Sequence, residues 1–169
     1  MAVADAPGPE HPVRAGTKLD LDHFLPYRLS VLSNRLSTAI ARIYAERLDL
    51  GITEWRVMAV LGLHPGLSAG EVAQRTAMDK VAVSRAVARL VEAGRVERGM
   101  DPEDRRRSVL HLTDAGQEIY AEVAPLALEF EQRLFGHLAP REREALFRQL
   151  DRLDSLDIEA WEPGPGPAP

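Results

Sequence analysis

The stretch DKVAVSRAVARLVEAG, residues 79–94, decides the fold of this chain. Asp79 is a residue type that caps helix N-termini, and Gly94 suits the position just beyond a helix C-terminus, so the residues between them are predicted to form a helix. At 3.6 residues per turn, one face of this helix is apolar and the opposite face is mixed. The apolar face consists of Val83, Ala86, Val87 and Leu90, and the mixed face consists of Val81, Ser84, Arg85 and Ala88, with Lys80 near the start and Arg89 on the flank.

The mixed face differs from an ordinary solvated helix surface, because it presents small groups among few charges. Its hydroxyl, methyl and guanidinium groups suit a helix that lies in the major groove of DNA and contacts base edges. An ordinary amphipathic helix is the alternative, and residues 79–94 taken alone leave both interpretations open.

The residues after Gly94 predict a β-hairpin with a basic tip. Arg95–Arg98 is expected to form a short strand, Gly99–Asp104 a turn-rich tip, and Ser108–Leu112 a second strand. Three consecutive arginines, Arg105–Arg107, stand at the end of this hairpin. Beside a helix that contacts bases, they suit contacts with phosphates and the minor groove, and the alternative is a solvated run of charge.

A shorter helix is predicted directly upstream. Ser68 and Glu71 have the spacing of a capping box, which opens a helix that runs to about Thr76. Only two residues separate that helix from the cap at Asp79. Two helices joined by so short a turn and followed by a hairpin indicate a winged helix-turn-helix.

Together these elements resemble the MarR family of winged helix-turn-helix transcriptional regulators. The resemblance implies a mainly α fold with a small β wing, in which the N- and C-terminal helices form a dimerisation region. It also implies a homodimer that binds double-stranded DNA. The matching stretches are Asp79–Arg85, Leu90–Gly94, Asp101–Arg106 and Leu112–Gly116, and the resemblance covers roughly Leu19 to Leu156.

Composition agrees with one globular domain, since 169 residues with 45% hydrophobic content can bury a core. The chain has no cysteine, no apolar run long enough to span a bilayer and no N-terminal signal pattern, so a cytoplasmic protein is expected. Residues 79–107 hold eight Lys/Arg and six Asp/Glu, so they carry +2 of the net charge of −5 and the remainder carries −7. The acidic remainder disfavours non-specific DNA binding while leaving the helix and hairpin attractive to DNA.

The flanking segments are predicted to be helices between two disordered tails, residues 1–18 and 162–169, which are rich in Pro, Gly and Ala. Leu67 is expected to add a short stretch of strand. The first expected helix starts near Leu21, or at Pro26 after a short lead-in, and ends at about Leu48. The second starts from a cap at Thr53 and ends at about Leu63, and the third runs from Thr113 to about His137 and contains Pro125. The last runs from Pro140 to about Leu156.

The first of these helices carries a long apolar stripe, and a second copy of the chain is the natural partner to cover it. The predicted dimerisation region is residues 19–50 and 114–158, around a DNA-binding lobe of residues 51–113. A twofold axis places two reading helices about one DNA turn apart, roughly 34 Å, and predicts a pseudo-palindromic operator.

The DNA-binding residues follow from chemistry and from the resemblance. In the major groove, Arg85 suits a guanine and Val81 a thymine methyl, with Lys80 and Ser84 beside them. Arg89 and the Ser68 hydroxyl are expected at phosphates. The resemblance places the minor-groove arginine at Arg106, with Asp104 orienting the tip through a salt bridge, whereas Arg105 and Arg107 leave the register open by one residue.

A ligand pocket is implied by the resemblance, because family members commonly bind small aromatic compounds that release DNA. The FLPYR stretch, residues 24–28, is similar to the subset that controls catabolism of hydroxycinnamates and related aromatic acids, some of which sense the CoA thioester. Arg28 and Arg35 would then bind an anionic group. The candidate lining is His23, Tyr27, Arg28, Arg35, Tyr44, Trp55 and Met58, of which Trp55 and Met58 are equally typical of a hydrophobic core.

Other classes of function fit the sequence less well. An enzyme is not expected, because no nucleophile elbow, phosphate loop or paired metal ligands are present. A metal-sensing regulator would have to use His23, His64 and the Asp20–Asp22 segment, whose spacing is not a metal signature. No cofactor is expected. A winged helix used for protein contacts is the main alternative, although it would not need Arg105–Arg107 beside Ser84 and Arg85.

Overall fold

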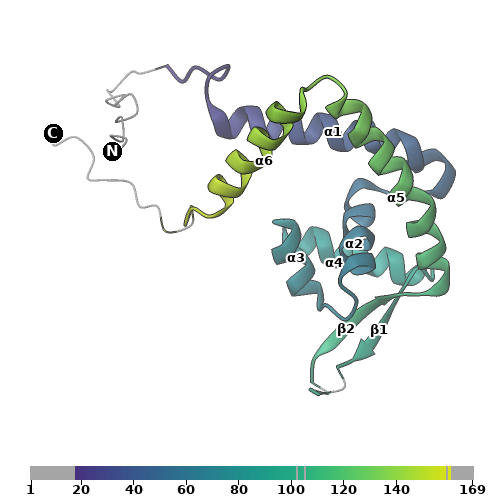
Figure 1. The fold of residues 1–169 in the computed structure, drawn as a ribbon. Coiled ribbons are helices and arrows are strands. Elements are labelled where there is room, and N and C mark those ends of the chain that lie inside the picture. The colour runs from purple at the N-terminus through teal and green to yellow at the C-terminus, as the bar shows by residue number, and fades with distance from the viewer. Residues whose placement is uncertain (1–17, 102, 105, 159, 161–169) are drawn as a thin grey trace. The chain divides into compact units, whose positions relative to one another are not determined.

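The computed structural model describes residues 18–101, 103–104, 106–158 and 160. These residues form six helices and one two-stranded antiparallel sheet, so the predicted mainly α fold with a small β wing is confirmed (Figure 1). The two predicted tails lie outside the described residues, except for Lys18. The elements are α1 (Leu25–Leu48), α2 (Ile52–Leu63), α3 (Ala69–Thr76), α4 (Lys80–Glu92), β1 (Val96–Met100), β2 (Ser108–Leu112), α5 (Asp114–Phe135) and α6 (Pro140–Asp154).

The chain divides into two compact units, residues 1–39 and 40–169. In the first unit, α1 begins at Leu25, which puts Pro26 in its first turn, where the missing N–H has no intrahelical acceptor to lose. The leucines of its apolar stripe, Leu25, Leu29 and Leu32, are exposed.

The core of the second unit forms around the inward face of α4. All four residues of its predicted apolar face, Val83, Ala86, Val87 and Leu90, are buried. This face packs against α2 and α3. Burial of a side chain the size of Val or Leu contributes about 1.5–3 kcal/mol, so this face anchors the helix. Neighbouring core residues are Val57, Met58, Leu61, Val72, Ala73, Val96, Leu110 and Leu112.

The predicted helix-turn-helix is confirmed at both of its ends. The capping box at Ser68 opens α3, and Ala77 ends it in the left-handed conformation with φ 49°. The Asp79 carboxylate then accepts a hydrogen bond from the Ala82 N–H at 2.9 Å. Gly94 has φ +68°, a left-handed backbone that glycine adopts without strain, and it turns the chain out of α4.

The start of α2 differs from the prediction. The helix begins at Ile52 after an N-cap at Gly51, so the predicted cap at Thr53 is wrong. The acceptor comes instead from Glu54, whose Oε2 accepts a hydrogen bond from the Gly51 N–H at 2.6 Å. Glu54 thus satisfies the N–H of the N-cap residue, whereas Gly51 has no side chain that could accept a hydrogen bond from the first turn.

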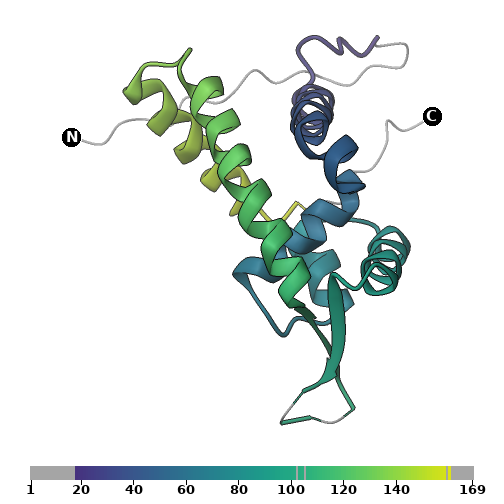
Figure 2. The ribbon, with the colours of Figure 1, turned by 90° about the vertical axis from the view of Figure 1, so that its right-hand side faces the viewer.

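The wing, residues 96–112, is the antiparallel hairpin of β1 and β2, with Val96 opposite Leu112 and Met100 opposite Ser108. The second strand has its predicted bounds, whereas the first strand starts at Val96 instead of Arg95 and ends at Met100 instead of Arg98. Both ribbon views show the wing extending beyond α2, α3 and α4 (Figures 1 and 2). At its base, the Leu110 N–H donates to the Leu67 carbonyl at 2.9 Å, as the expected short strand at Leu67 requires.

Arg95 connects the start of the wing to the end of α1. Its guanidinium donates to the carbonyls of Leu48 at 2.6 Å and Asp49 at 3.0 Å. Both acceptors belong to the last turn of the helix and its exit, where carbonyls lack intrahelical partners. A cation at this end also complements the helix dipole.

The helix α5 is capped by Thr113 and continues through Pro125 to Phe135, two residues short of the predicted end at His137. The Thr113 Oγ1 accepts from the Gly116 N–H at 3.1 Å and donates to the Gly94 carbonyl at 2.6 Å. The same hydroxyl therefore starts α5 and binds it to the turn after α4.

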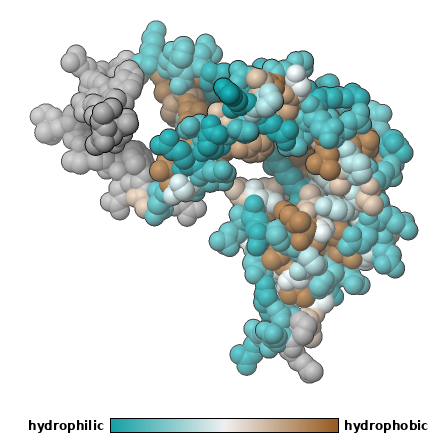
Figure 3. Space-filling model, viewed as in Figure 1, coloured by the Kyte–Doolittle hydropathy of each residue, from teal (hydrophilic) through white to brown (hydrophobic). Residues whose placement is uncertain are grey.

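The last two helices carry apolar side chains at the surface. The Phe135 and Phe147 rings lie 5.6 Å apart between centroids, and the Arg143 guanidinium lies 4.5 Å above the Phe135 ring. Brown, hydrophobic patches are visible among the hydrophilic surface in Figure 3. None of the described helices is long and apolar enough to cross a membrane. The exposed apolar residues of α5, α6 and their connection are Leu128, Leu134, Leu138, Leu146, Phe147 and Leu150.

Substitution of Gly116 by Ala should destabilise the protein, because a Cβ there would lie 2.0 Å from the Arg95 carbonyl oxygen. The backbones of α5 and Arg95 would have to separate, and we expect a loss of roughly 1–3 kcal/mol in the free energy of unfolding, measured in urea. Gly70→Ala is the matched control, since its Cβ would meet nothing nearer than the Ser68 Oγ at 3.9 Å. Equal stability of Gly116→Ala and the wild type would contradict the close approach.

Candidate nucleic-acid interface

The outward face of α4 has the composition and exposure that the sequence predicts. Lys80, Ser84, Arg85 and Ala88 are all exposed, and the Val81 residue is 55% exposed. Among the described residues, neither Lys80 nor Arg85 forms an ion pair. The face is therefore small, open and free to contact an external partner, because the opposite face holds the helix in the core.

Arg89, on the flank of the same helix, is paired within the protein. Its Nε contacts the Oε1 of Glu54, whose other oxygen accepts the Gly51 N–H. Glu54 is only 8% exposed, so the ion pair compensates a largely buried carboxylate. The Arg89 side chain is still 64% exposed, which leaves its terminal nitrogens accessible.

Ser68 stands at the start of α3 and is engaged by Glu71. Its Oγ donates to the Glu71 Oε2 at 2.7 Å and accepts from the Glu71 N–H at 3.3 Å. The Glu71 carboxylate also accepts the Ser68 N–H at 2.8 Å, so the capping box is complete. Both residues are partly buried.

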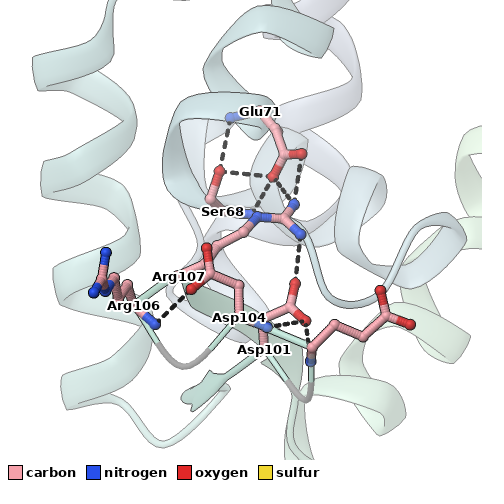
Figure 4. Close-up of polar contacts among 7 residues, drawn as sticks. Ser68, Glu71, Asp101, Asp104, Arg106 and Arg107 are labelled. Carbon is pink, nitrogen blue, oxygen red and sulfur yellow. Dashed lines mark hydrogen bonds and ion pairs between the residues drawn. The ribbon is translucent and has the colours of Figure 1, made fainter.

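Arg107, the last of the three arginines, is bound by two carboxylates (Figure 4). One terminal nitrogen donates to the Asp101 Oδ2 at 2.6 Å, and the other donates to the Glu71 Oε1 at 2.6 Å and also contacts the Glu71 Oε2. We call Arg107, Glu71 and Asp101 the Arg107 cluster. It joins the two sides of the wing tip to the first turn of α3.

The cluster changes the acidity of its members. The hydrogen bond from Arg107 is the largest of the causes that lower the pKa of Glu71 to about 2, followed by the hydrogen bond from Ser68. The backbone N–H of Glu103, and then Arg107, lowers the pKa of Asp101. Hydrogen bonding to Glu71 and then to Asp101 raises the pKa of Arg107. All three groups are therefore charged at neutral pH.

Arg106 lies beside the cluster but outside it. Its side chain is exposed and points away from Arg107 in Figure 4, while its N–H donates to the Asp104 Oδ1 at 3.0 Å. The salt bridge expected of Asp104 is not among the ion pairs of the described residues, where Asp101 binds the wing arginine instead. Arg105 lies outside the described residues.

Sequence reasoning assigned no role to Asp101 and only a capping role to Glu71. Met100 and Ser108 are the last pair of the two strands, and Asp101 follows Met100 while Arg107 precedes Ser108. The hairpin register alone could therefore have placed Asp101 and Arg107 opposite each other. Glu71 could not have been paired with Arg107 from the sequence, because 36 residues separate them.

The residues of the predicted ligand pocket fall in both units. In the first unit, an open groove along residues 21–35 is lined in part by Tyr27, Arg28 and Arg35. His23 is not among its lining residues and binds the Asp20 carboxylate through Nδ1 at 2.7 Å, which lowers the pKa of Asp20.

In the second unit, the predicted pocket residues lie in or against the core. Tyr44 is 1% exposed and Met58 is fully buried, and burial raises the pKa of Tyr44. Trp55 is partly buried between Tyr44 and Tyr120, with ring centroids 5.8 Å and 6.1 Å away. The described residues include no group of three or more His, Asp or Glu side chains placed to hold a metal ion.

Comparison with known proteins links this geometry to one family. The sequence model of the MarR family matches residues 48–107, from the end of α1 to the Arg107 cluster. The chain is similar to the transcriptional regulator HosA of Escherichia coli O111:H-, with 31% identity over 112 residues that cover 66% of this chain and 82% of HosA. It is also similar to the transcriptional repressor NicR of Pseudomonas putida, with 28% identity over 123 residues that cover 73% of this chain and 78% of NicR.

A solved structure agrees with these sequence matches. The MarR/EmrR family transcriptional regulator from Acinetobacter sp. ADP1 has a TM-score of 0.74 and 30% identity, and the match covers 80% of this chain and 96% of that one. The winged helix-turn-helix and its flanking helices are thus common to both chains.

Glu71→Gln should remove a contribution to stability that depends on pH in a defined way. The Glu71 pKa is lowered from 4.5 to about 2 in the folded protein, so the stabilisation is fully present above pH 4.5 and is lost as the pH falls toward 2. We expect the difference in unfolding free energy between wild type and Glu71→Gln to be constant near neutral pH and to shrink below pH 4.5. Urea unfolding at a series of pH values measures it.

Glu103→Gln is the control for this series, because Glu103 is an exposed acid in the same turn that lies outside the cluster. Its unfolding free energy should follow that of the wild type at each pH. A Glu71→Gln difference that stayed constant down to pH 2 would show that the ionised carboxylate contributes nothing.

Proposed function

This chain belongs to the MarR family of transcriptional regulators, and on that premise we propose that it is a homodimeric, sequence-specific DNA-binding repressor released by a small aromatic acid or its CoA thioester. The observation that carries the DNA-binding proposal is the exposed face of α4, where Lys80 and Arg85 have no internal ion pair among the described residues. The similarity to the transcriptional repressor NicR supports repression over activation. A DNA-binding regulator of this kind acts in the cytoplasm.

In the proposed complex, α4 lies in the major groove. Arg85 has the length and planar donors to bind a guanine O6 and N7 together, and Val81 contacts a thymine methyl. Ser84 lies on the same face, and Lys80 at the N-terminus of the helix adds charge close to the backbone. The small size of this face supports the assignment, because it allows the helix backbone to approach base edges closely.

Two further residues are proposed at phosphates, Arg89 and Ser68. Arg89 is held on the flank of α4 by Glu54 through Nε, which leaves its terminal nitrogens to donate to a phosphate. The Ser68 hydroxyl donates to Glu71, so it would have to turn away from Glu71 in order to donate to a phosphate. Of the two, Arg89 is the better placed.

In the wing, Arg106 is proposed as the minor-groove residue. It is exposed, its side chain points away from the Arg107 cluster, and its backbone is held by Asp104. Arg105 is proposed as a neighbouring contact.

The dimer is proposed to form through residues 19–50 and 114–158, around DNA-binding lobes of residues 51–113. Apolar side chains of α5 and α6 support this assignment, because Leu128, Leu134 and Leu146 are exposed in the single chain. A twofold axis then gives two copies of α4 for two half-sites about one DNA turn apart, roughly 34 Å. The operator is accordingly pseudo-palindromic.

The effector is proposed to carry an aromatic ring and an anionic group. The groove along residues 21–35 supports this, because it combines a tyrosine, Tyr27, with two arginines, Arg28 and Arg35. The ring would pack on Tyr27 and the anion would pair with the guanidinium groups. His23, Tyr44, Trp55 and Met58 remain candidate effector-binding residues.

The DNA-binding proposal is tested by titration of duplex DNA from upstream of the gene, at several salt concentrations. Arg85→Ala should weaken specific binding by about 1–3 kcal/mol and relax the preference at one base position. Arg106→Ala should weaken binding at least about 10-fold and leave the dimer intact in ultracentrifugation.

Lys18→Ala is the control for lost charge, because Lys18 is an exposed residue outside both the proposed dimerisation region and the proposed DNA-binding lobe. Its affinity for the same duplex should stay close to that of the wild type. If the wild type bound neither this DNA nor any site in a genome-wide search, a winged helix for protein contacts would replace the present proposal.

The effector proposal is tested by adding aromatic acids and their CoA thioesters to the protein–DNA complex. One compound is expected to weaken DNA binding about 10-fold or more, a typical coupling between two sites. The double variant Arg28→Ala, Arg35→Ala should bind DNA like the wild type but require more compound for release. If the variant responded like the wild type, the groove along residues 21–35 would not be the effector site.

A further inference from the structure

We propose that Arg107 is a positioning residue that holds the wing against α3, and that it does not contact DNA itself. This inference rests on the proposed DNA-binding function. It assigns different tasks to two adjacent arginines of the tip, Arg106 and Arg107, which the sequence alone cannot separate.

The hydrogen-bond donors of Arg107 are already used within the protein. Both terminal nitrogens donate to carboxylates, one to Asp101 at 2.6 Å and the other to Glu71 at 2.6 Å. The Arg107 side chain is only 37% exposed, while Arg106 is exposed and directed away from the cluster (Figure 4). A phosphate would have to displace charge-assisted hydrogen bonds that are already formed.

The charge of the Arg107 cluster also disfavours a phosphate contact. One guanidinium lies between two carboxylates, so the Arg107 cluster carries a net negative charge. A phosphate is repelled by such a group, since both acids stay ionised at neutral pH with their pKa values lowered. Two acids on a DNA-facing surface weaken DNA binding by themselves. Their presence there is explained by a different task, which is to hold Arg107.

Arg107 also anchors the tip of the wing. An isolated two-stranded hairpin is only marginally stable in water, so the far end of the wing needs an anchor. Near the base the anchor is the hydrogen bond between Leu110 and Leu67, and near the tip it is the bond from Arg107 to Glu71. Since Glu71 also caps α3 through Ser68, the wing tip is joined to the first turn of the helix-turn-helix.

The position of Arg106 follows from this anchor. The Arg107 N–H donates to the Asp104 carbonyl at 2.9 Å, and the Arg106 N–H donates to the Asp104 Oδ1 at 3.0 Å, so the backbone of both arginines is fixed by one residue. With Arg107 held inward by Glu71 and Asp101, Arg106 is turned outward. The cluster thus sets the distance and direction between Arg106 and the exposed face of α4.

The experiment measures affinity for the operator duplex after the acids of the cluster are neutralised, in the full-length protein. Glu71→Gln and Asp101→Asn each remove a negative charge close to the DNA, which by itself would strengthen binding. As positioning partners of Arg107, they should instead weaken binding by roughly 10-fold, the order of a lost charge-assisted hydrogen bond. Arg107→Lys keeps the charge but cannot span both carboxylates, and it should also weaken binding.

A double-variant comparison separates positioning from a general loss of stability. Arg106→Ala should cost less affinity in the Glu71→Gln background than in the wild type, because the displaced wing no longer brings Arg106 to the groove. Glu103→Gln, in the same turn, is the control and should bind as tightly as the wild type or more tightly. Gln at position 71 can still complete the capping box, and Asp101→Asn leaves that box untouched, so at least one variant keeps α3 intact.

The outcomes discriminate between the two proposals. If Glu71→Gln and Asp101→Asn bound DNA more tightly than the wild type, Arg107 would be a DNA contact freed from competition, and the positioning role would be overturned. An equal cost of Arg106→Ala in both backgrounds would overturn it as well. If the wild type itself bound no specific DNA, the proposed function would fail together with this inference.

Discussion

The structure depends on the complete burial of one face of α4. Val83, Ala86 and Val87 have no exposed surface, and with Leu90 they fix the helix against α2 and α3. Because the hydrophobic effect secures that side, the opposite side is free of any structural requirement. Its residues can therefore be small and polar, which is the property that a helix in a DNA groove requires.

Internal ion pairs then determine which cations remain available. Glu54 binds Arg89, and Glu71 with Asp101 binds Arg107, so two basic residues near the proposed DNA interface are paired in whole or in part within the protein. Lys80, Arg85 and Arg106 are exposed. Although the chain has a net charge of −5, these exposed basic residues can still attract DNA. The nearby acids Glu54, Glu71 and Asp101 pair with other arginines, Arg89 and Arg107.

The segment that leads from α4 into the wing is also bound by the end of α1 and by the start of α5. Arg95 binds the carbonyls at the end of α1, and Thr113 binds the Gly94 carbonyl while it caps α5. The close packing of Gly116 on the Arg95 carbonyl leaves no room for a side chain. The Arg95 side chain therefore joins the end of α1 to the start of the wing, and the Thr113 hydroxyl joins the start of α5 to the turn after α4.

The sequence by itself determined the elements whose signals are local. Helical periodicity gave the faces of α4, the caps at Asp79 and Ser68 gave two helix starts, and the alternation of strand and turn residues gave the wing. The start of α2 was misplaced because its N-cap residue, Gly51, has no polar side chain to mark the helix start in the sequence. The order of motifs was enough to predict the winged helix-turn-helix, since each of its parts lies within a few residues of the next.

Only the tertiary structure decided how the arginines are used. The sequence left the register of Arg105, Arg106 and Arg107 open by one residue, and the partner that distinguishes Arg107 is Glu71, 36 residues away. Likewise, only packing decided that Tyr44 and Met58 lie in the core, while Tyr27, Arg28 and Arg35 line a groove. The physical reason is the same in both cases: a hydrogen bond or a packing contact between distant residues depends on where the fold places them, and periodicity and spacing describe near neighbours only.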